Sequence, residues 1–398
     1  MPDTRVPRWA VVLVLLAALV ATLVLLQRGG TSTRSGTAAC RLDGRLTPSE
    51  FGARGDGTTD DALALQRALN SAGSRHVPLT LGCRTYVVGR TLNIPSGVTL
   101  TGFGARSVLH FTWVDQRGAN SRGPAFLQAQ GSPNSPVAGV TLTNLTVDGP
   151  TTGRPTGLSK LHPNGQAPGV RFLNVRGFTI RNVEVRNVPS IGIDYLNSSN
   201  GVITQNFVHN TGRDGITGFY NNFAGPANIQ VTANRISNVG DDAIAVNGAA
   251  TASQAPVVSR PSDFVISNNT IHGWPADPNG LMLGRGIAII SAVRVTITNN
   301  LIDRTAGDGI LIVYDDKTSD LGTNPAGHSS YITVTGNRIQ DAGQDRGSNP
   351  AGSPNNVRAG LQVRGADHVL IRDNTITNSA GPPTAVDRST CTDSCTIE

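Results

Sequence analysis

A short strand-turn-strand phrase recurs through the middle and C-terminal parts of this 398-residue chain. Apolar and polar residues alternate within each copy, many of the apolar ones are β-branched, and no helix-length amphipathic segment separates the copies. A period of two is typical of strands. Stacked copies of such strands predict a solenoid, and we expect an all-β, right-handed parallel β-helix. Eight copies align on two apolar residues five positions apart: Leu142/Val147, Ile180/Val185, Ile203/Val208, Val231/Ile236, Ile266/Ile271, Ile297/Ile302, Val334/Ile339 and Ile371/Ile376.

The last six copies share an Asn at one position of the turn. Asn tolerates the left-handed backbone of a tight corner, and stacked amides can hydrogen-bond along a solenoid axis. We therefore predict a structural ladder at Asn206, Asn234, Asn269, Asn300, Asn337 and Asn374.

Composition agrees with one long solenoid rather than two ordinary domains. The chain has 46 Gly, 23 Pro and only 15% charged residues, which suits many short strands and turns. Its net charge of +6 is compatible with an acidic partner. The arginines are scattered, and no helix-turn-helix, zinc or aromatic-stacking module is visible, so we expect no nucleic-acid partner. We expect a monomer.

The N-terminus predicts export. Arg5 and Arg8 precede an apolar run of 18 residues from Trp9 to Leu26, just long enough to span a bilayer. We favour a signal anchor at residues 1–26 over a cleaved signal peptide, with an extracytoplasmic linker at 27–47. The protein would then be extracytoplasmic, either membrane-anchored through this segment alone or secreted.

Four cysteines in an exported chain predict disulfides. Cys391 and Cys395 are close enough to pair locally, which leaves Cys40 with Cys83 as the other combination. A metal site is the alternative for the C-terminal pair, but no His lies near it.

A helix is expected after the linker, within F-G-A-R-G-D-G-T-T-D-D-A-L-A-L-Q-R-A-L-N-S-A-G at residues 51–73. Thr58 or Thr59 can cap it, Asp60 and Asp61 suit its first turn, and Gly73 would end it. Its apolar face would consist of Ala62, Leu65, Leu69 and Ala72.

This segment, with L-G-C-R-T-Y-V-V and G-V-T-L-T-G-F-G downstream, resembles the N-terminal signature of the pectate-lyase superfamily of β-helix proteins. The resemblance implies that the short helix caps the solenoid. It also implies a β-helix catalytic domain over residues 48–380, followed by a C-terminal tail at 381–398 that carries the Cys pair.

Carboxylates line up in the second strand of each coil. The copies align on a small residue at Gly192, Gly215, Ala243, Gly286, Gly309 and Gly360. The preceding residue forms a column of Ile191, Asp214, Asp242, Arg285, Asp308 and Ala359, with Asp241 one step further back. Stacked members of a column stand about 4.8 Å apart, so Asp214, Asp241 and Asp242 should converge. Like charges at that distance raise a pKa and create the protonated acid beside an ionised base that glycoside hydrolysis requires.

The same residues carry a second resemblance. R-D-G-I at 213–216, G-D-D-A-I-A-V at 240–246 and G-R-G-I-A-I at 284–289 look like the N-T-D-G-I, G-D-D-C-I-A-I and G-H-G-I coils of polygalacturonase-type glycoside hydrolases. The resemblance implies an inverting hydrolase with Asp242 as general acid and with Asp214 and Asp241 as the base that holds the water.

The chain departs from that family pattern at two places. Arg285 stands where the family has His, and G-I-L-I-V at 309–313 stands where the family has an R-I-K triplet that grips the uronate carboxylate. Leu311 and Val313 cannot bind a carboxylate, so the resemblance does not extend to galacturonate as the substrate.

Two alternatives remain. A Ca²⁺-dependent polysaccharide lyase or epimerase would use Arg285 as base and Asp194, Asp214 and Asp242 as metal ligands, with Asp241 a further candidate ligand. We prefer the hydrolase because a neutral Arg beside acids is costly. For the hydrolase we expect no cofactor. If the Asp residues only close turns, as Asp-Gly often does, the protein is a non-catalytic glycan-binding surface solenoid.

Long segments rich in Gly, Pro, Ser and Asn should wall a groove for a polysaccharide, whose acidic or neutral character stays open. Tyr220 could stack on a sugar ring. Asp308 suits turn formation as well as binding. The predicted substrate-binding residues are Arg285, Asp308, Tyr314, Lys317 and Arg358.

Overall fold

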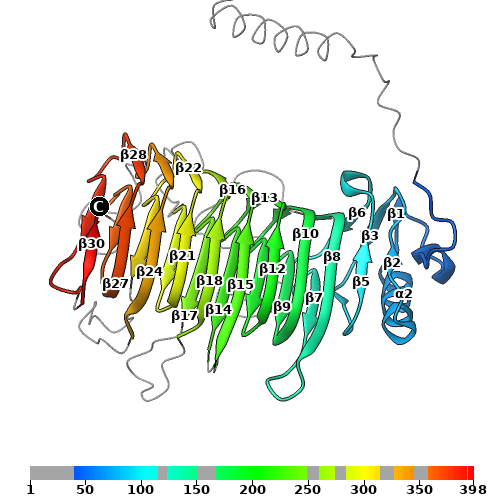
Figure 1. Ribbon diagram of the computed structural model, residues 1–398. Coiled ribbons are helices and arrows are strands. Elements are labelled where there is room, and N and C mark those ends of the chain that lie inside the picture. The colour runs from blue at the N-terminus through cyan, green and yellow to red at the C-terminus, as the bar shows by residue number, and fades with distance from the viewer. Residues whose placement is uncertain are drawn as a thin grey trace, which may run out of the picture. The chain divides into compact units, whose positions relative to one another are not determined.

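The structure is a computed structural model that describes residues 40–114, 123–150, 167–221, 223, 225–248, 260–273, 284–313, 327–344, 357–391 and 393–398. Residues from Leu42 to Glu398 form one compact unit. Its strands form successive coils from the N-terminal to the C-terminal end of this unit (Figure 1). Every pairing between named strands is parallel, which is the predicted parallel β-helix.

One face of the solenoid is a ten-stranded sheet, to which each coil contributes one short strand. In order along the solenoid the strands are β4 (Leu92–Asn93), β7 (Leu127–Gln130), β9 (Val170–Leu173), β11 (Ile193–Leu196), β14 (Ile216–Tyr220), β17 (Ile244–Gly248), β20 (Ile287–Ile290), β23 (Ile310–Val313), β26 (Leu361–Val363) and β29 (Thr384–Val386).

The other two faces belong to one twenty-stranded sheet, because β10 pairs with both β12 and β13 of the next coil. The strands are β1 (Asp56–Asp60), β2 (Leu79–Thr80), β3 (Thr85–Val88), β5 (Thr99–Thr101), β6 (Val108–Phe111), β8 (Val137–Asp148), β10 (Val175–Val188), β12 (Ser199–Thr204), β13 (Phe207–Thr211), β15 (Pro226–Thr232), β16 (Arg235–Val239), β18 (Ser262–Ser267), β19 (Thr270–His272), β21 (Val293–Thr298), β22 (Leu301–Asp303), β24 (Ser329–Thr335), β25 (Arg338–Gln340), β27 (Ala366–Arg372), β28 (Thr375–Thr377) and β30 (Cys395–Ile397).

The predicted capping helix is present as α2 (Ala62–Arg75), and it lies at the N-terminal end of the solenoid (Figure 1). Two short 3-10 helices, η1 (Pro48–Phe51) and η2 (Gly104–Arg106), flank this region. The predicted apolar face of α2 is buried, and it consists of Ala62, Leu65, Leu69 and Ala72 together with Ala64 and Ala68.

The predicted ends of this helix are wrong. Thr58 and Thr59 lie in β1, where both hydroxyls donate to the Asp56 carboxylate, so neither caps the helix. At the other end α2 passes Gly73 and stops at Arg75, because His76 adopts the left-handed conformation with φ 53°.

Apolar side chains fill the interior of the solenoid as one continuous core. Tyr220 belongs to this core. It is fully buried, its ring lies 5.7 Å from that of Phe264, and its hydroxyl donates to the carbonyl of Ser198 at 3.0 Å. The expectation that Tyr220 stacks on a sugar is therefore wrong.

The predicted Asn ladder is present. Each amide Nδ2 donates to the Oδ1 of the next ladder Asn at 2.9–3.0 Å, from Asn206 to Asn374. The left-handed residue of each turn is not the ladder Asn but the one before it, such as Ala233 with φ 54° and Asn268 with φ 56°. The ladder Asn is thus selected by its hydrogen bonds rather than by its tolerance of positive φ.

Replacing Asn269 with Ala should destabilise the solenoid by about 3 kcal/mol, because buried donors on Asn234 lose their acceptor. Chemical denaturation of the purified protein measures the change in the free energy of unfolding. Asn374→Ala is the matched control, since this half-buried residue ends the ladder and should cost about 1 kcal/mol. Equal costs at both positions would contradict a cooperative buried ladder.

Both predicted disulfide regions are confirmed. Cys391 and Cys395 are bonded to each other, and Cys40 and Cys83 are also disulfide-bonded.

The predicted C-terminal tail differs from the structure, because β29 pairs with β26 and β30 pairs with β27. The solenoid therefore continues beyond residue 380 into the segment that carries the Cys pair.

The predicted signal anchor at residues 1–26 lies outside the described residues. Among the helices that the structure does describe, none is both long and apolar enough to span a bilayer.

Candidate functional site

The predicted column of charged residues lies at the turns that lead into the ten-stranded sheet. The register aligns Ile216 with Ile244, Ile244 with Ile287 and Ile287 with Ile310. Asp214, Asp242, Arg285 and Asp308 each precede one of these residues by two positions, so they occupy consecutive coils. Backbone hydrogen bonds extend the same register through the turns, from Gly215 N–H to Asp242 O, Ala243 N–H to Arg285 O and Gly286 N–H to Asp308 O.

Three carboxylates converge at this place, as predicted. Asp214, Asp241 and Asp242 each place one carboxylate oxygen within 4.8 Å of the other two. We call these three residues the acid cluster. Asp214 and Asp242 are almost inaccessible, with 3% and 4% of their side chains exposed, and Asp241 is 8% exposed.

Arg285 lies against the acid cluster. Its Nε donates to Asp242 Oδ1 at 2.6 Å, and its Nη2 donates to Asp242 Oδ2 and Asp241 Oδ1, both at 3.3 Å. A two-point contact between guanidinium and carboxylate is a strong, directional ion pair. Arg285, which we predicted to bind substrate, therefore holds Asp241 and Asp242 in place.

Arg213 is the second cation of the site, and its role was missed in the sequence. Its Nη2 lies 3.7 Å from Asp214 Oδ2, an oxygen that has no hydrogen-bond donor within the described residues. The R-D-G-I motif contains Arg213, but adjacency along a chain does not show that two side chains lie on the same side of a turn.

The acid cluster favours keeping a proton near neutral pH. Burial raises the pKa of Asp214 to about 6, helped by the charge of Asp241 and opposed by Arg213. Burial also raises the pKa of Asp242, against the opposing contact with Arg285. Among the described residues these three carboxylates have two guanidinium groups beside them, so one bound proton brings the group closest to charge balance.

Asp214 should make the protein less stable as the pH rises from about 4 to 6. Its folded pKa of about 6 exceeds the ordinary value of 3.8, so the folded state binds this proton more tightly than the unfolded state does. The resulting stabilisation is complete below pH 3.8 and is lost as the pH rises through 6. We compare the unfolding free energies of wild type and Asp214→Asn from pH 4 to 8. As the pH rises, the value for wild type should fall relative to the value for the variant. A difference that does not change with pH would contradict the assignment.

The acid cluster could supply three oxygen ligands to a hard cation such as Ca²⁺. The guanidinium of Arg285 already places positive charge on two of them. Asp194, a ligand in the lyase alternative, is not part of this group. Its Oδ2 accepts a hydrogen bond from Arg171 Nε at 2.8 Å, an ion pair on neighbouring coils that the sequence analysis missed.

The remaining predicted binding residues do not join the acid cluster. Asp308 is fully buried, and its Oδ1 accepts the backbone N–H of Ala359 at 2.7 Å, which supports the turn role considered for it. Arg358 is half-buried in the turn before β26, with φ 59°. Tyr314 and Lys317 lie outside the described residues.

The ten-stranded sheet carries a separate apolar group on β20 and β23, one and two coils beyond Asp242. Leu311, Val313 and Ile290 pack together there and are buried. Leu311 and Val313 occupy the segment where polygalacturonase-type enzymes have their R-I-K triplet. The structure therefore offers no cation at these two positions for a sugar carboxylate.

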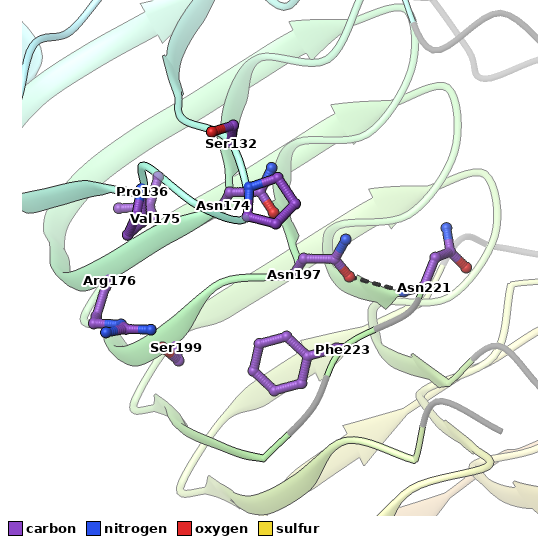
Figure 2. A pocket seen from close by; sticks show the side chains of 10 residues that line it. Ser132, Pro136, Asn174, Val175, Arg176, Asn197, Ser199, Asn221 and Phe223 are labelled. Atoms are coloured by element: carbon purple, nitrogen blue, oxygen red, sulfur yellow. Dashed lines mark hydrogen bonds between the residues drawn. The ribbon is translucent and has the colours of Figure 1, made fainter. Parts of the chain in front are cut away.

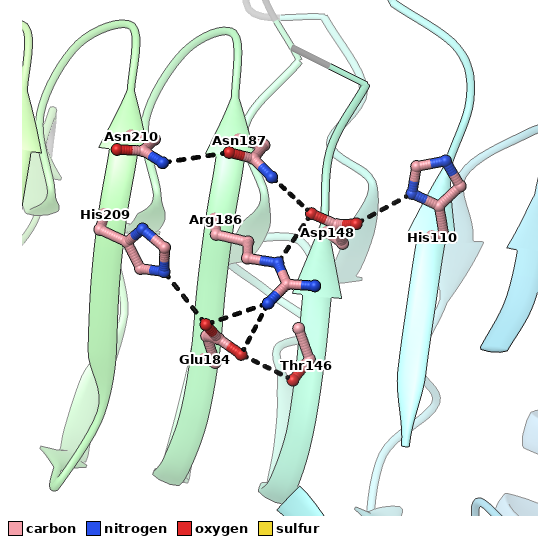
Figure 3. Close-up of polar contacts among 8 residues, drawn as sticks. All are labelled: His110, Thr146, Asp148, Glu184, Arg186, Asn187, His209 and Asn210. Atoms are coloured by element: carbon pink, nitrogen blue, oxygen red, sulfur yellow. Dashed lines mark hydrogen bonds and ion pairs between the residues drawn. The ribbon is translucent and has the colours of Figure 1, made fainter. Parts of the chain in front are cut away.

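A second group of titratable residues lies on the twenty-stranded sheet (Figure 3). Asp148 contacts His110 and Arg186, while Glu184 contacts Arg186 and His209, all at 3.0–3.2 Å. The hydrogen bond from His209 is the largest of the effects that lower the pKa of Glu184 to about 2. Each acid of this network is paired with a cationic or His side chain, and the pairs join neighbouring coils.

Comparison with known proteins places these features in context. The chain matches the profile of a family described as rhamnogalacturonase A/epimerase, pectate lyase-like, over residues 49–311. The pre-neck appendage protein of Bacillus phage phi29 is 28% identical over 141 residues, which is 35% of this chain and 15% of the phage protein. The chain thus spans only a small part of the length of this relative.

Two solved structures illustrate the fold. An exopolygalacturonase from Thermotoga maritima has a TM-score of 0.58 at 13% identity, over 87% of this chain and 90% of that enzyme. A tailspike protein mutant of E. coli bacteriophage HK620, in complex with a hexasaccharide, has a TM-score of 0.59 at 15% identity, over 86% of this chain and 59% of the tailspike. These likenesses show the fold alone, and the predicted right-handed parallel β-helix is confirmed.

Proposed function

Since the chain belongs to the rhamnogalacturonase A/epimerase, pectate lyase-like family, we propose that it cleaves a polysaccharide by acid-base hydrolysis at the acid cluster. One observation carries the proposal, namely three buried carboxylates within 4.8 Å of one another with two guanidinium groups beside them. Buried acids that share a proton are a recurring source of general acids at neutral pH.

The contacts of each Asp support a division of roles that differs from the one the resemblance implies. Burial raises the pKa of Asp242, but both of its oxygens contact Arg285, and we give this two-point contact the greater weight and assign Asp242 the anionic role. Asp214 has a buried oxygen without a hydrogen-bond donor among the described residues, so we assign it the proton. Asp241 is the most exposed of the three and is our candidate base.

In the proposed reaction, the proton of Asp214 passes to the glycosidic oxygen as its bond to the anomeric carbon breaks. A water molecule attacks that carbon and gives a proton to Asp241. Asp214 thus ends the step ionised and Asp241 ends it protonated. Oxygens within 4.8 Å of one another are close enough for one water to bridge two of them. The fixed anion of Asp242 stabilises the positive charge that develops on the sugar.

The carboxyl separation does not favour the inverting outcome that we predicted. Inverting glycosidases hold their two carboxyl groups roughly 6.5–9.5 Å apart, so that a water fits between carboxylate and sugar. One carboxylate oxygen of each acid in the cluster lies within 4.8 Å of the other two, and Arg285 contacts both Asp241 and Asp242. Whether the reaction inverts or retains the anomeric configuration is therefore tested separately, by the stereochemistry of the product.

The contacts of Arg285 disfavour the lyase alternative in which it is the base. Burial lowers the pKa of Arg285, but the charges of Asp242 and Asp241 outweigh burial and place the pKa above its ordinary value. A guanidinium in that position stays protonated and cannot abstract a sugar proton.

We also propose that the enzyme acts outside the cytoplasm, because the apolar segment at residues 1–26 would direct its export.

The test is a product analysis on a panel of acidic and neutral polysaccharides, with and without Ca²⁺. Hydrolysis should produce new reducing ends without the ultraviolet absorbance of unsaturated uronate, and Ca²⁺ should not be required. Ca²⁺-dependent absorbance would replace the proposal with a lyase. Binding without either signal would replace the proposal with an epimerase or a glycan-binding solenoid.

A further inference from the structure

A pocket of about 470 Å³ lies where the chain passes from the ten-stranded to the twenty-stranded sheet (Figure 2). Asn174 lies between β9 and β10, Asn197 lies between β11 and β12, and Asn221 follows β14. Asp214 lies at the other end of β14, seven residues before Asn221. At about 3.3 Å per residue, the pocket is roughly 20 Å from the acid cluster. It is thus a separate site, of a volume typical for small-ligand pockets, roughly 300–1,000 Å³.

Successive coils present amide groups to this pocket. Asn174 donates its Nδ2 to the carbonyl of Gly131 at 3.2 Å, and its Oδ1 has no hydrogen-bond partner in the described part of the chain. Asn197 accepts the backbone N–H of Asn221 with its Oδ1 at 2.8 Å, and its Nδ2 likewise has no partner among the described residues. One acceptor and one amide donor are therefore left for a ligand, at corners held by the backbone of adjacent coils.

A cation and an aromatic ring complete the lining. Figure 2 shows the side chains of Arg176, Ser199 and Phe223 along one side of the pocket. The Arg176 side chain makes no ion pair or hydrogen bond with any described residue, and Arg176 is exposed at the start of β10. The Phe223 ring packs edge-on against Tyr220 with the ring centroids 4.9 Å apart, which anchors it to the core.

We propose that this pocket is a saccharide-binding subsite for a uronate residue of the polysaccharide. The Asn amides and the Ser199 hydroxyl match sugar hydroxyl groups, Phe223 offers an apolar surface to the ring, and Arg176 can pair with the carboxylate. The identity of the ligand as a saccharide rests on the proposed function, but its acidic character rests on Arg176. A polysaccharide held there would be retained while a different segment reaches the acid cluster.

Calorimetric titration with three trimers, of galacturonate, mannuronate and glucuronate, tests the proposal. Each trimer is compared with its methyl ester, which removes only the carboxylate charge. All titrations use the Asp214→Asn chain, in which the expected loss of activity slows consumption of the probe. At least one trimer should bind, about tenfold more tightly than its ester, as expected for one charge-assisted contact.

In the same background, Arg176→Gln should weaken that binding about tenfold. Arg181→Gln is the matched control, because Arg181 is exposed on the same strand but does not line the pocket, and it should leave binding unchanged. Phe223→Leu should also weaken binding, with thermal unfolding showing that the fold persists. The proposal is overturned if no trimer binds, or if binding is indifferent to esterification or to Arg176→Gln.

Discussion

Replacing Asp214, Asp241 or Asp242 with Asn, one at a time, should lower kcat by about 10²–10⁴-fold, the usual contribution of a general acid or base. Asn keeps the size and the hydrogen-bonding capacity of the side chain but cannot exchange a proton. Because the three carboxyls place oxygens within 4.8 Å of one another, the losses should be far from additive when two substitutions are combined. The measurement is the initial rate of reducing-end formation on the polysaccharide that the product analysis identifies.

Asp308→Asn is the matched control for these variants. Asp308 is equally buried and belongs to the same column, two coils from Asp242, but it accepts a backbone hydrogen bond and is not part of the acid cluster. Asn can accept the same hydrogen bond, so this variant should keep most of the activity. Full activity in any of the three cluster variants would remove that residue from the mechanism.

Replacing Arg285 with Gln should lower the free energy of unfolding by about 3–5 kcal/mol, the cost of leaving a buried charge without its partner. Arg285 makes the two-point contact with Asp242 and also reaches Asp241, so both acids lose their counter-charge. The double variant Arg285→Gln/Asp242→Asn should recover much of the loss, because it also removes the charge of Asp242, the more buried of the two acids. Urea denaturation of the four proteins of this cycle gives the coupling energy.

Arg285→Lys should not substitute for Arg, since a single ammonium cannot reproduce the two-point contact. A cost below about 1 kcal/mol for Arg285→Gln, as for an exposed ion pair, would show that the contact is solvated and weak. The division of roles that we assign to Asp242 and Asp214 would then lose its support.

The repeat made the fold and the position of the acid cluster predictable. Each coil contributes one residue to every column, so aligning Gly215, Ala243, Gly286 and Gly309 already fixed which charged residues are neighbours. The same periodicity identified the Asn ladder, although not which residue of each turn is left-handed. Backbone register follows from a repeat because parallel strands in a solenoid have little freedom to slip.

The roles of individual side chains were less predictable. Arg285 was placed in the correct column, but sequence alone does not show that its guanidinium turns back onto Asp242 rather than outward to a substrate. Tyr220 could have been placed correctly, since it follows the buried Ile216 by four positions in β14, and alternate residues of a strand face the same side. The N-terminal cap of α2 was mispredicted because Asp56 accepts both Thr hydroxyls first.

The most direct test of the acid cluster is a ¹³C NMR titration of the Asp carboxyl carbons in selectively labelled protein, with signals assigned through the three Asp→Asn variants. Our account predicts that the carboxyl of Asp214 stays protonated until the pH approaches about 6, and that removing it shifts the titration of Asp242. If all three carboxyls ionise independently near the ordinary value of 3.8, no shared proton exists at neutral pH and the proposed acid-base centre is wrong.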